Sequence, residues 1–289
     1  MNFNKDTNIL IIGLGVIGGS YAAALTQKGY KVSCITKEKR DIDYAMEHGM
    51  ISRGTTELDC ELIRDSDLII FALYPTVFIE WIEKNKSLIK KGTLITDVTG
   101  VKSSVVERVQ NILPQGIELI SAHPMAGKER SGVEYSDPGV FTGANYIVTP
   151  TEKNSKEAIE ICKELGRVLG FARISELTVK EHDEMIAFLS QLTHCIAVSL
   201  MTCNNTEGLE KYTGDSFRDL TRIAKINDRM WSELFIMNKD ALLREMDAFL
   251  KEFSAFRDML AEEKVEEMRE KMRLSTERRG LFDKPKGSR

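Results

Sequence analysis

The chain has 289 residues, of which 42% are hydrophobic and 29% are charged, a composition typical of a folded globular protein with one or two domains. Its 40 basic and 44 acidic residues give a net charge of −4, which excludes a general attraction to nucleic acid or to an anionic membrane. Five cysteines without a C-x-x-C pair favour reduced thiols and a cytoplasmic location over a zinc site or disulfide framework. No signal peptide and no apolar run of membrane-spanning length is recognised, so we expect no membrane partner.

The first predicted elements form a dinucleotide-binding pattern. A buried parallel strand over residues 8–12 leads directly into G-L-G-V-I-G (13–18), and a helical pattern over 17–28 and a second strand over 31–35 follow. This order of strand, G-x-G-x-x-G, helix and strand is the context that the dinucleotide fingerprint requires, with the pyrophosphate on the helix N-terminus. The residues expected to hold it are Gly13, Gly15, Val16, Ile17 and Gly18.

The end of the second strand bears on the choice between NAD and NADP. An NAD site usually has an acidic residue about 20 residues after the loop, where it binds the ribose hydroxyls. The chain instead has Thr36, Lys37, Glu38, Lys39 and Arg40 here. The hydroxyl of Thr36 and the cations of Lys37 and Arg40 suit a 2′-phosphate, which slightly favours NADP. In the alternative, the loop is a solvated one and Glu38 binds the ribose, so both cofactors stay open.

Strands and helices continue to alternate up to about residue 175. Helices are expected over 41–48, 76–89, 103–113 and 155–169, and strands over 67–73, 93–96, 117–122 and 145–149. Such alternation predicts an α/β fold with a doubly wound (Rossmann) parallel sheet, here over 1–175. Tyr74 and Thr99 each follow a strand at the carboxyl edge, where we expect the nicotinamide end of the cofactor.

His123 follows the apolar run 117–122 and opens the segment H-P-M-A-G. Because the residue before a proline is pushed into an extended conformation, we expect His123 at the very end of its strand, on the edge where ligands bind. A lone histidine in such a place is more often a capped core residue than a functional one. A neutral imidazole on this edge is also suited to accept a proton near pH 7.

Helical periodicity dominates the chain from about residue 181, and no proline occurs from there until Pro285. The second domain, 176–275, is therefore predicted to be all-α, and 276–289 is expected to be a frayed tail. Apolar residues recur at helical spacing over 231–273, and a domain of this size has too few partners to cover them. A homodimer through these helices is the interpretation that follows.

Two stretches of the helical half carry polar groups that suit a substrate. Gln191 and His194 share one helix face, although His194 alone fits a core histidine equally well. Arg218 and Arg222, at i and i+4, belong to a cationic stripe. The stripe is either a solvated face paired with nearby acids or a clamp for a carboxylate. No residues have metal-ligand spacing, so no metal is expected.

Four segments together resemble the prephenate dehydrogenase family, and the resemblance covers nearly the whole chain. The segments are I-I-G-L-G-V-I-G-G-S (11–20), H-P-M-A-G-K-E-R-S-G-V-E (123–134), H-D-E-M-I-A-F-L-S-Q-L-T-H (182–194) and F-R-D-L-T-R-I-A (217–224) with Met230-Trp231. The resemblance implies a Rossmann domain followed by an all-α substrate and dimerisation domain. It also implies oxidative decarboxylation of prephenate to 4-hydroxyphenylpyruvate with hydride transfer to NAD(P)+, in tyrosine biosynthesis. Arogenate dehydrogenase and a non-catalytic NAD(P) sensor are the alternatives.

The resemblance assigns roles to single residues. His123 is the expected catalytic base for the substrate hydroxyl, and Arg222 is expected to bind the ring carboxylate of the substrate. His194 also contacts the substrate, and Glu129 lies near the pocket entrance and helps to organise the site. Arg218 is placed in the same substrate-binding set.

Two positions depart from the pattern of the family. Gln191 stands where many members have a histidine, and Gly100 where many have a serine that is thought to hydrogen-bond to the catalytic histidine or the substrate. Thr99 or Ser103 could replace that serine, which leaves the orientation of His123 open. Feedback inhibition by tyrosine is not decided by the sequence.

Overall fold

The computed structural model describes residues 3–127 and 130–283 of the chain. The chain forms two compact units, Met1–Asn238 and Lys239–Arg289, which are described separately. The sequence predicts a domain boundary near residue 175, between a Rossmann part and a helical part. Residues 176–238 lie in the first unit, where Gln191 and Asp183, for example, hydrogen-bond to other elements of the same unit.

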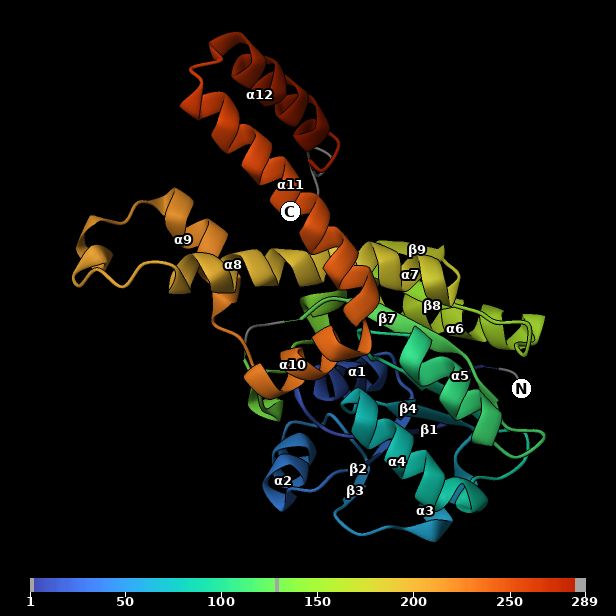
Figure 1. Ribbon diagram of the computed structural model, residues 1–289. Helices are drawn as coiled ribbons and strands as arrows, with labels where there is room; N and C mark the ends of the chain where they lie inside the picture. Colours follow the sequence, from blue (N-terminus) through green and yellow to red (C-terminus); the bar gives the residue numbers. More distant parts are fainter. Residues whose placement is uncertain (1–2, 128–129, 284–289) are drawn as a thin grey trace. The chain divides into compact units, whose positions relative to one another are not determined.

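The first unit is built on a six-stranded sheet in which all paired strands are parallel, with the order β3-β2-β1-β4-β5-β6. Figure 1 labels β1 to β4 of this sheet. The strands are β1 (Asn8–Ile12), β2 (Lys31–Ile35), β3 (Arg53–Thr55), β4 (Leu68–Phe71), β5 (Leu94–Asp97) and β6 (Glu118–Leu119). The order reverses between β1 and β4, which makes the carboxyl ends of these two strands the switch point where ligands bind in such sheets. The predicted Rossmann fold is confirmed; the short strand β3 was not predicted.

Helices cover both faces of this sheet because its strands are apolar on both sides. Ile9 and Ile11 of β1 belong to one hydrophobic core, whereas Leu10 and Ile12 belong to the other. The first core also contains side chains of α1 (Val16–Gln27), α2 (Lys39–Glu47) and α6 (Lys156–Leu169). The second contains side chains of α3 (Cys60–Asp65), α4 (Pro75–Asn85) and α5 (Ser103–Ile112). A continuous apolar run is what a strand buried on both faces requires.

A second, three-stranded sheet carries His123, which corrects the expectation of a single parallel sheet. In it β7 (Ser121–Met125) pairs antiparallel with β8 (Asn145–Thr149), and β8 pairs parallel with β9 (Arg173–Glu176). His123 lies opposite Ile147 in the middle of β7, so its expected place at the strand end is wrong. Pro124 is tolerated inside the strand because β7 is an edge strand, where a missing N–H need not break a ladder.

The rest of the first unit is helical, as predicted. Helix α7 (Val179–Ile186), a π-helical segment (Ala187–Leu192) and α8 (Thr193–Thr202) follow one another without a break, and a capping box of Thr178 and Glu181 begins them. The chain continues through α9 (Asp215–Thr221), a 3-10 turn (Arg222–Ala224) and α10 (Asp228–Met237). Shorter 3-10 turns lie at Lys86–Leu88, Val133–Tyr135, Pro138–Phe141 and Leu209–Tyr212.

By length and composition alone, Val179–Thr202 could cross a membrane, so the expectation that no segment reaches that length is wrong. The core helix of a folded domain has the same length and composition. This helix carries three buried polar side chains, His182, Asp183 and Gln191, each hydrogen-bonded to another element of the first unit.

The second unit consists of α11 (Lys239–Ala261) and α12 (Val265–Gly280), joined by a turn at Glu263, whose φ is 51°. The two helices contact each other, and Lys271 of α12 forms an ion pair with Glu252 of α11. Helix α12 continues to Gly280, inside the stretch 276–289 that was expected to fray; residues 284–289 lie outside the described residues.

Candidate functional site

The glycine loop between β1 and α1 leaves a place for a ligand next to its backbone. A Cβ added to Gly13, whose φ is +97°, would lie 2.5 Å from the carbonyl oxygen of Ala72, and one added to Gly18 would lie 2.1 Å from that of Gly13. In the part of the chain that the structure describes, no atom beyond those of Gly15 and its chain neighbours lies within 4 Å of a Cβ added to Gly15. Two of the glycines are thus required by close packing, and the third leaves open space in front of the helix. Helix α1 has no acidic residue in its first turn, so no carboxylate of that turn competes for its N-terminal amides. The loop fits a dinucleotide pyrophosphate.

The cations that follow β2 have acidic neighbours. The guanidinium of Arg40 lies 3.7 Å from the carboxylate of Glu134 and 3.7 Å from that of Asp41. The Lys39 ammonium lies 2.6 Å from the carboxylate of Asp43. Lys37 is exposed, at the place where the sequence predicts the adenosine ribose. Positive charge at the end of β2 is therefore partly balanced within the protein.

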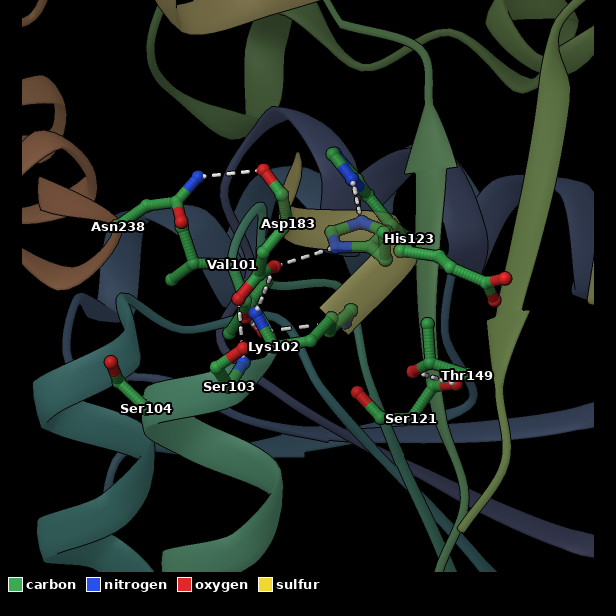
Figure 2. A network of polar contacts seen from close by, with 12 residues as sticks. Val101, Lys102, Ser103, Ser104, Ser121, His123, Thr149, Asp183 and Asn238 are labelled. Atoms are coloured by element: carbon green, nitrogen blue, oxygen red, sulfur yellow. Dashed lines mark hydrogen bonds and ion pairs between the residues drawn. The ribbon is translucent and has the colours of Figure 1, made fainter. Parts of the chain in front are cut away.

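His123 is the first member of a chain of three hydrogen-bonded side chains. Its Nδ1 lies 2.9 Å from Nε2 of His182, and Nδ1 of His182 lies 2.7 Å from Oδ1 of Asp183. The carboxylate of Asp183 also accepts hydrogen bonds from the backbone amides of Lys102 (2.9 Å) and Ser103 (2.7 Å) at the start of α5. Figure 2 shows Asp183 between this turn and the imidazole rings.

A buried ion pair between Lys102 and Asp97 lies next to His123 and holds its strand in place. The ammonium of Lys102 donates to Oδ1 of Asp97 (2.9 Å) and to the carbonyl oxygen of Ala122 (2.7 Å). Ser121 donates a hydrogen bond to the other oxygen of Asp97, and Thr99 donates to Oδ1. Both members of the pair are fully buried, so the additional hydrogen bonds are what make burial of the charges tolerable. The pair ties the end of β5 to β7, next to His123.

Burial and neighbouring charges set the protonation of these groups. Burial, and then the nearby His182 and Lys102, hold the pKa of His123 well below its ordinary value. Burial also lowers the pKa of His182. Burial raises the pKa of Asp183, but the hydrogen bonds from His182 and Ser103 outweigh it and the net pKa is lowered. Near neutral pH the site holds an uncharged imidazole at His123 and an ionised carboxylate at Asp183.

The predicted substrate-binding residues lie on helices of the first unit. The ring of His194 stacks on Trp231 of α10 at 3.7 Å between centroids, and its Nδ1 donates to the carbonyl of Ser190 (2.8 Å). Arg222 is exposed and begins a 3-10 turn that contacts α8, the helix of His194. Arg218 pairs with Asp215 at 2.9 Å, as the alternative of a solvated stripe predicts.

Glu129, the fourth predicted substrate-binding residue, lies outside the described residues.

Helix α10 lies against the carboxyl edge of the sheet. Glu233 accepts a hydrogen bond from the amide of Thr76 (2.6 Å), and Asn227 donates to the hydroxyl of Tyr74 (3.1 Å). Leu234 of the same helix lies 3.7 Å from a Cβ added to Gly100. The predicted nicotinamide position at Tyr74 is thus next to helical residues that follow Arg222 in the chain.

Gly100 lies beside His123, at the place where the resemblance puts a serine. A Cβ added to Gly100 would lie 3.8 Å from Cε1 of His123. The hydroxyl of Thr99 donates to Asp97, and Ser103 holds Asp183, so the structure gives His123 a different partner, His182.

Gln191, the other position that departs from the pattern, joins its own helix to α10 and to Asn238. It donates to the carbonyl of Leu234 (3.0 Å) and accepts from Asn238 (2.8 Å).

Sequence reasoning missed His182, Asp183 and the Asp97–Lys102 pair. The available signal was weak: an H-D dipeptide just inside a helix start, and an acidic residue that ends an apolar strand.

Comparison with known proteins identifies the family. The family model of the prephenate dehydrogenase nucleotide-binding domain matches residues 21–174, and that of the prephenate dehydrogenase dimerization domain matches 178–274. The prephenate dehydrogenase of Bacillus subtilis is 31% identical over 275 residues, covering 93% of this chain and 74% of the relative. The cyclohexadienyl dehydrogenase of Zymomonas mobilis is 30% identical over 266 residues, covering 88% of both chains.

A solved structure agrees with these sequence matches. Prephenate dehydrogenase from Aquifex aeolicus, in complex with hydroxyphenyl propionate and NAD+, superposes with a TM-score of 0.89 at 29% identity, covering 98% of this chain and 100% of that one. The arogenate dehydrogenase of Synechocystis has the same fold, with a TM-score of 0.82 at 21% identity, covering 96% of this chain and 100% of that one. With both domain models matched and relatives that span most of its length, the chain belongs to the prephenate dehydrogenase family.

Proposed function

We propose that the chain oxidatively decarboxylates prephenate to 4-hydroxyphenylpyruvate, a step of tyrosine biosynthesis, and that His123 is its catalytic base. The observation that carries the proposal is the partly buried, neutral imidazole of His123 on β7, which lies beside Gly100 in the loop that follows β5 of the sheet with the dinucleotide-binding loop. The family membership and the prephenate dehydrogenases among the relatives support it.

The bound NAD(P)+ would accept a hydride from the substrate ring. Gly13, Gly15 and Gly18, with the amides of Val16 and Ile17, would hold its pyrophosphate. Tyr74 and Thr99 would lie at its nicotinamide end, and Thr36, Lys37 and Arg40 at its adenosine ribose. Thr99 is buried, and its hydroxyl donates a hydrogen bond to Asp97. It would therefore contribute to the shape of the nicotinamide site and not a hydrogen bond to the cofactor.

The chemistry needs one base. His123 would accept the proton of the hydroxyl on the ring carbon that loses the hydride, and the O–H electron pair would become part of a carbonyl. The bond between the ring and its carboxylate then breaks, carbon dioxide leaves, and the electron pair enters the ring. The phenolic oxygen takes back the proton, so His123 ends neutral and ready for another turnover.

The substrate carries two carboxylates, so binding needs cations. Arg222 would bind the ring carboxylate through its forked donors, and His194 would contact the substrate from the helix that Arg222 packs against. Glu129 would help to organise the entrance. Arg218 is a weaker candidate than Arg222 because it already pairs with Asp215.

Cofactor preference rests on the loop after β2. Thr36 and Lys37 favour a 2′-phosphate, whereas the carboxylates of Glu134 and Asp41 beside Arg40 oppose one. We therefore place the slight preference for NADP on Lys37. Replacing Lys37 by Ala should weaken binding of NADP and leave binding of NAD unchanged.

A homodimer and a cytoplasmic location complete the proposal. Exposed apolar side chains on α11 form a stripe that suits a partner helix, and the family name of residues 178–274 is a dimerization domain. The stripe consists of Leu243, Leu250, Phe253 and Leu260.

The test crosses prephenate and arogenate with NAD and NADP and follows the absorbance of the reduced cofactor. Turnover of prephenate is the expected result, and the faster cofactor decides the preference. Turnover of arogenate alone would keep the chemistry and change the substrate. Bound cofactor without turnover in any combination would contradict the proposal and favour an NAD(P) sensor.

A further inference from the structure

The ring of His123 is hydrogen-bonded through Nδ1 to Nε2 of His182, and Nδ1 of His182 is hydrogen-bonded to the carboxylate of Asp183. We propose that His182 and Asp183 are positioning residues that hold His123 in one tautomer and one ring orientation, with the Nε2 atom left bare for the substrate. The proposal rests on the proposed function for its substrate, whereas the hydrogen-bonded chain is a property of the protein itself.

The direction of both hydrogen bonds follows from the carboxylate of Asp183. Both oxygens of Asp183 accept backbone amides, from Lys102 and Ser103, so the carboxylate is fixed as an acceptor. Nδ1 of His182 must therefore carry the hydrogen and donate it over 2.7 Å. A neutral His182 then has a lone pair on Nε2, which can only accept from Nδ1 of His123. His123 is left with its lone pair on Nε2.

The ring orientation is fixed as well as the tautomer. His182 is fully buried, and its ring is inclined by 60° to that of His123 at 5.1 Å between centroids. The backbone carbonyl of Asp183 accepts from Asn238 (2.9 Å), so the carboxylate and the main chain of this residue are held from two sides, as Figure 2 shows. A base whose partners are this constrained needs no rearrangement before proton transfer.

His182 and Asp183 would also stabilise the positive charge that forms on His123 during the reaction. Once His123 Nε2 takes the substrate proton, its Nδ1–H donates from an imidazolium to His182, whose own N–H points at an ionised carboxylate. A histidine held by a buried aspartate behaves in the same way in serine proteases, where the aspartate orients the ring without becoming protonated. Gly100 provides no side chain that could do this in the present protein, although it lies next to the ring.

The most direct test reads the tautomers without any substrate. The chain has only four histidines, so a long-range ¹H–¹⁵N spectrum of ¹⁵N-histidine-labelled protein near pH 7.5 can be assigned with one substitution per histidine. We expect His123 and His182 to be neutral, each with a protonated Nδ1 and a bare Nε2. A protonated Nε2 on His123, or a charged His123, would overturn the proposal.

The second test separates positioning from binding. Asp183→Asn keeps the size of the side chain but offers a donor in place of one acceptor, so the favoured tautomer of His182 changes. We expect kcat to fall by about 10²- to 10⁴-fold, by analogy with the same change in a serine protease, while the KM for prephenate and the Kd for the dinucleotide change by less than about threefold. If Asp183→Asn left both kcat and the ¹⁵N signals of the His123 ring unchanged, the proposal would be overturned.

Rescue and control variants exclude a purely structural effect. His182→Leu should lose as much kcat as Asp183→Asn, and His182→Gln should recover part of it because its amide oxygen can still accept from His123. Thr149→Val removes a buried hydrogen bond to Ser121 in the same sheet and should leave kcat unchanged. An equal loss of kcat in His182→Gln and His182→Leu, or a similar loss in Thr149→Val, would contradict a positioning role for His182. If the wild type reduces no dinucleotide, the proposed function fails, and the tautomer spectrum still decides this inference.

Discussion

At the scale of single residues, the protonation of the site is set by what surrounds each group. His123 has a depressed pKa because it is buried and because His182 and Lys102 lie near it. The carboxylate of Asp183 stays ionised although burial opposes it, because three hydrogen bonds hold its oxygens. An imidazole in this state can accept a proton near pH 7, as the proposed role of His123 as a base requires.

Protein stability should depend on pH through the same histidines. The pKa of His123 and of His182 is lower in the folded protein than its ordinary value of about 6.5, so the unfolded chain binds more protons at mildly acidic pH. Their contribution is fully present above about pH 6.5 and is lost as the pH falls towards the folded pKa, by up to about 1.4 kcal/mol per pH unit for each proton. Urea unfolding at several pH values measures this slope.

A matched pair of variants assigns that slope. His123→Gln and His182→Gln should each make the dependence shallower than in the wild type, because each removes one histidine whose pKa is lower in the folded protein. Equal slopes in all three proteins would contradict the assignment to the buried histidines.

Arg222 is the residue on which substrate binding is expected to depend. Arg222→Ala should raise the KM for prephenate with a smaller effect on kcat, at a cost of about 2–5 kcal/mol in binding if a desolvated charge pair is lost. Lys225→Ala, which removes an exposed cation three residues later in the chain, serves as the control. Steady-state kinetics at saturating cofactor distinguish the two, and an unaltered KM in the Arg222 variant would contradict the carboxylate clamp.

At the scale of elements, the site is assembled from strands of two sheets and from the first parts of two helices. The six-stranded sheet supplies the glycine loop and Asp97, and the edge strand β7 of the second sheet supplies His123. Helix α7 brings His182 and Asp183, and α5 begins on the carboxylate of Asp183. The capping box at Thr178 fixes the residue at which α7 starts, and therefore fixes the position of His182 along the helix.

The glycine loop gives a prediction that separates packing from ligand binding. Gly15→Ala adds a methyl group to open space, so the free protein should keep its melting temperature while its affinity for the dinucleotide falls. Gly18→Ala places the methyl group 2.1 Å from a carbonyl oxygen and should lower the melting temperature itself. Thermal melts with and without cofactor measure both effects, and a Gly15→Ala protein with wild-type affinity would contradict the site.

Local patterns explain which elements could be predicted from the sequence. The run N-I-L-I-I followed by three spaced glycines is a local signal for β1, the loop and α1, and the structure confirms all three. The pairing of β7 with β8 was not predictable, because it depends on contacts between strands that are distant in the chain. The sequence pattern of an apolar strand that leads into His-Pro is the same whether the strand belongs to the six-stranded or to the three-stranded sheet.

The site was predictable only in part for the same reason. His123 stood out because of its strand, but its partner His182 lies 59 residues away in sequence, in a helix whose start is polar for ordinary capping reasons. Lys102 and Asp97 are five residues apart, and the turn after β5 brings their side chains into contact.

At the scale of the whole molecule, the helical half is expected to join two copies of the chain. The stripe on α11 is 49–64% exposed at its four apolar residues, Leu243, Leu250, Phe253 and Leu260. Replacing Leu250 and Phe253 by Glu should convert a dimer into monomers, because charges on a buried apolar interface are not tolerated. Sedimentation velocity measures the change. A wild type that is already monomeric at micromolar concentration would contradict the dimer.

The proposed reaction is tested most directly by its stoichiometry. A limiting amount of prephenate is incubated with the protein and an excess of the preferred dinucleotide, and reduced cofactor, carbon dioxide and 4-hydroxyphenylpyruvate are all quantified. We predict one equivalent of each per prephenate consumed, and for His123→Asn a rate lower by about 10²- to 10⁴-fold with cofactor still bound. Bound dinucleotide that is not reduced by the wild type, or an unchanged rate in the His123 variant, would contradict the account.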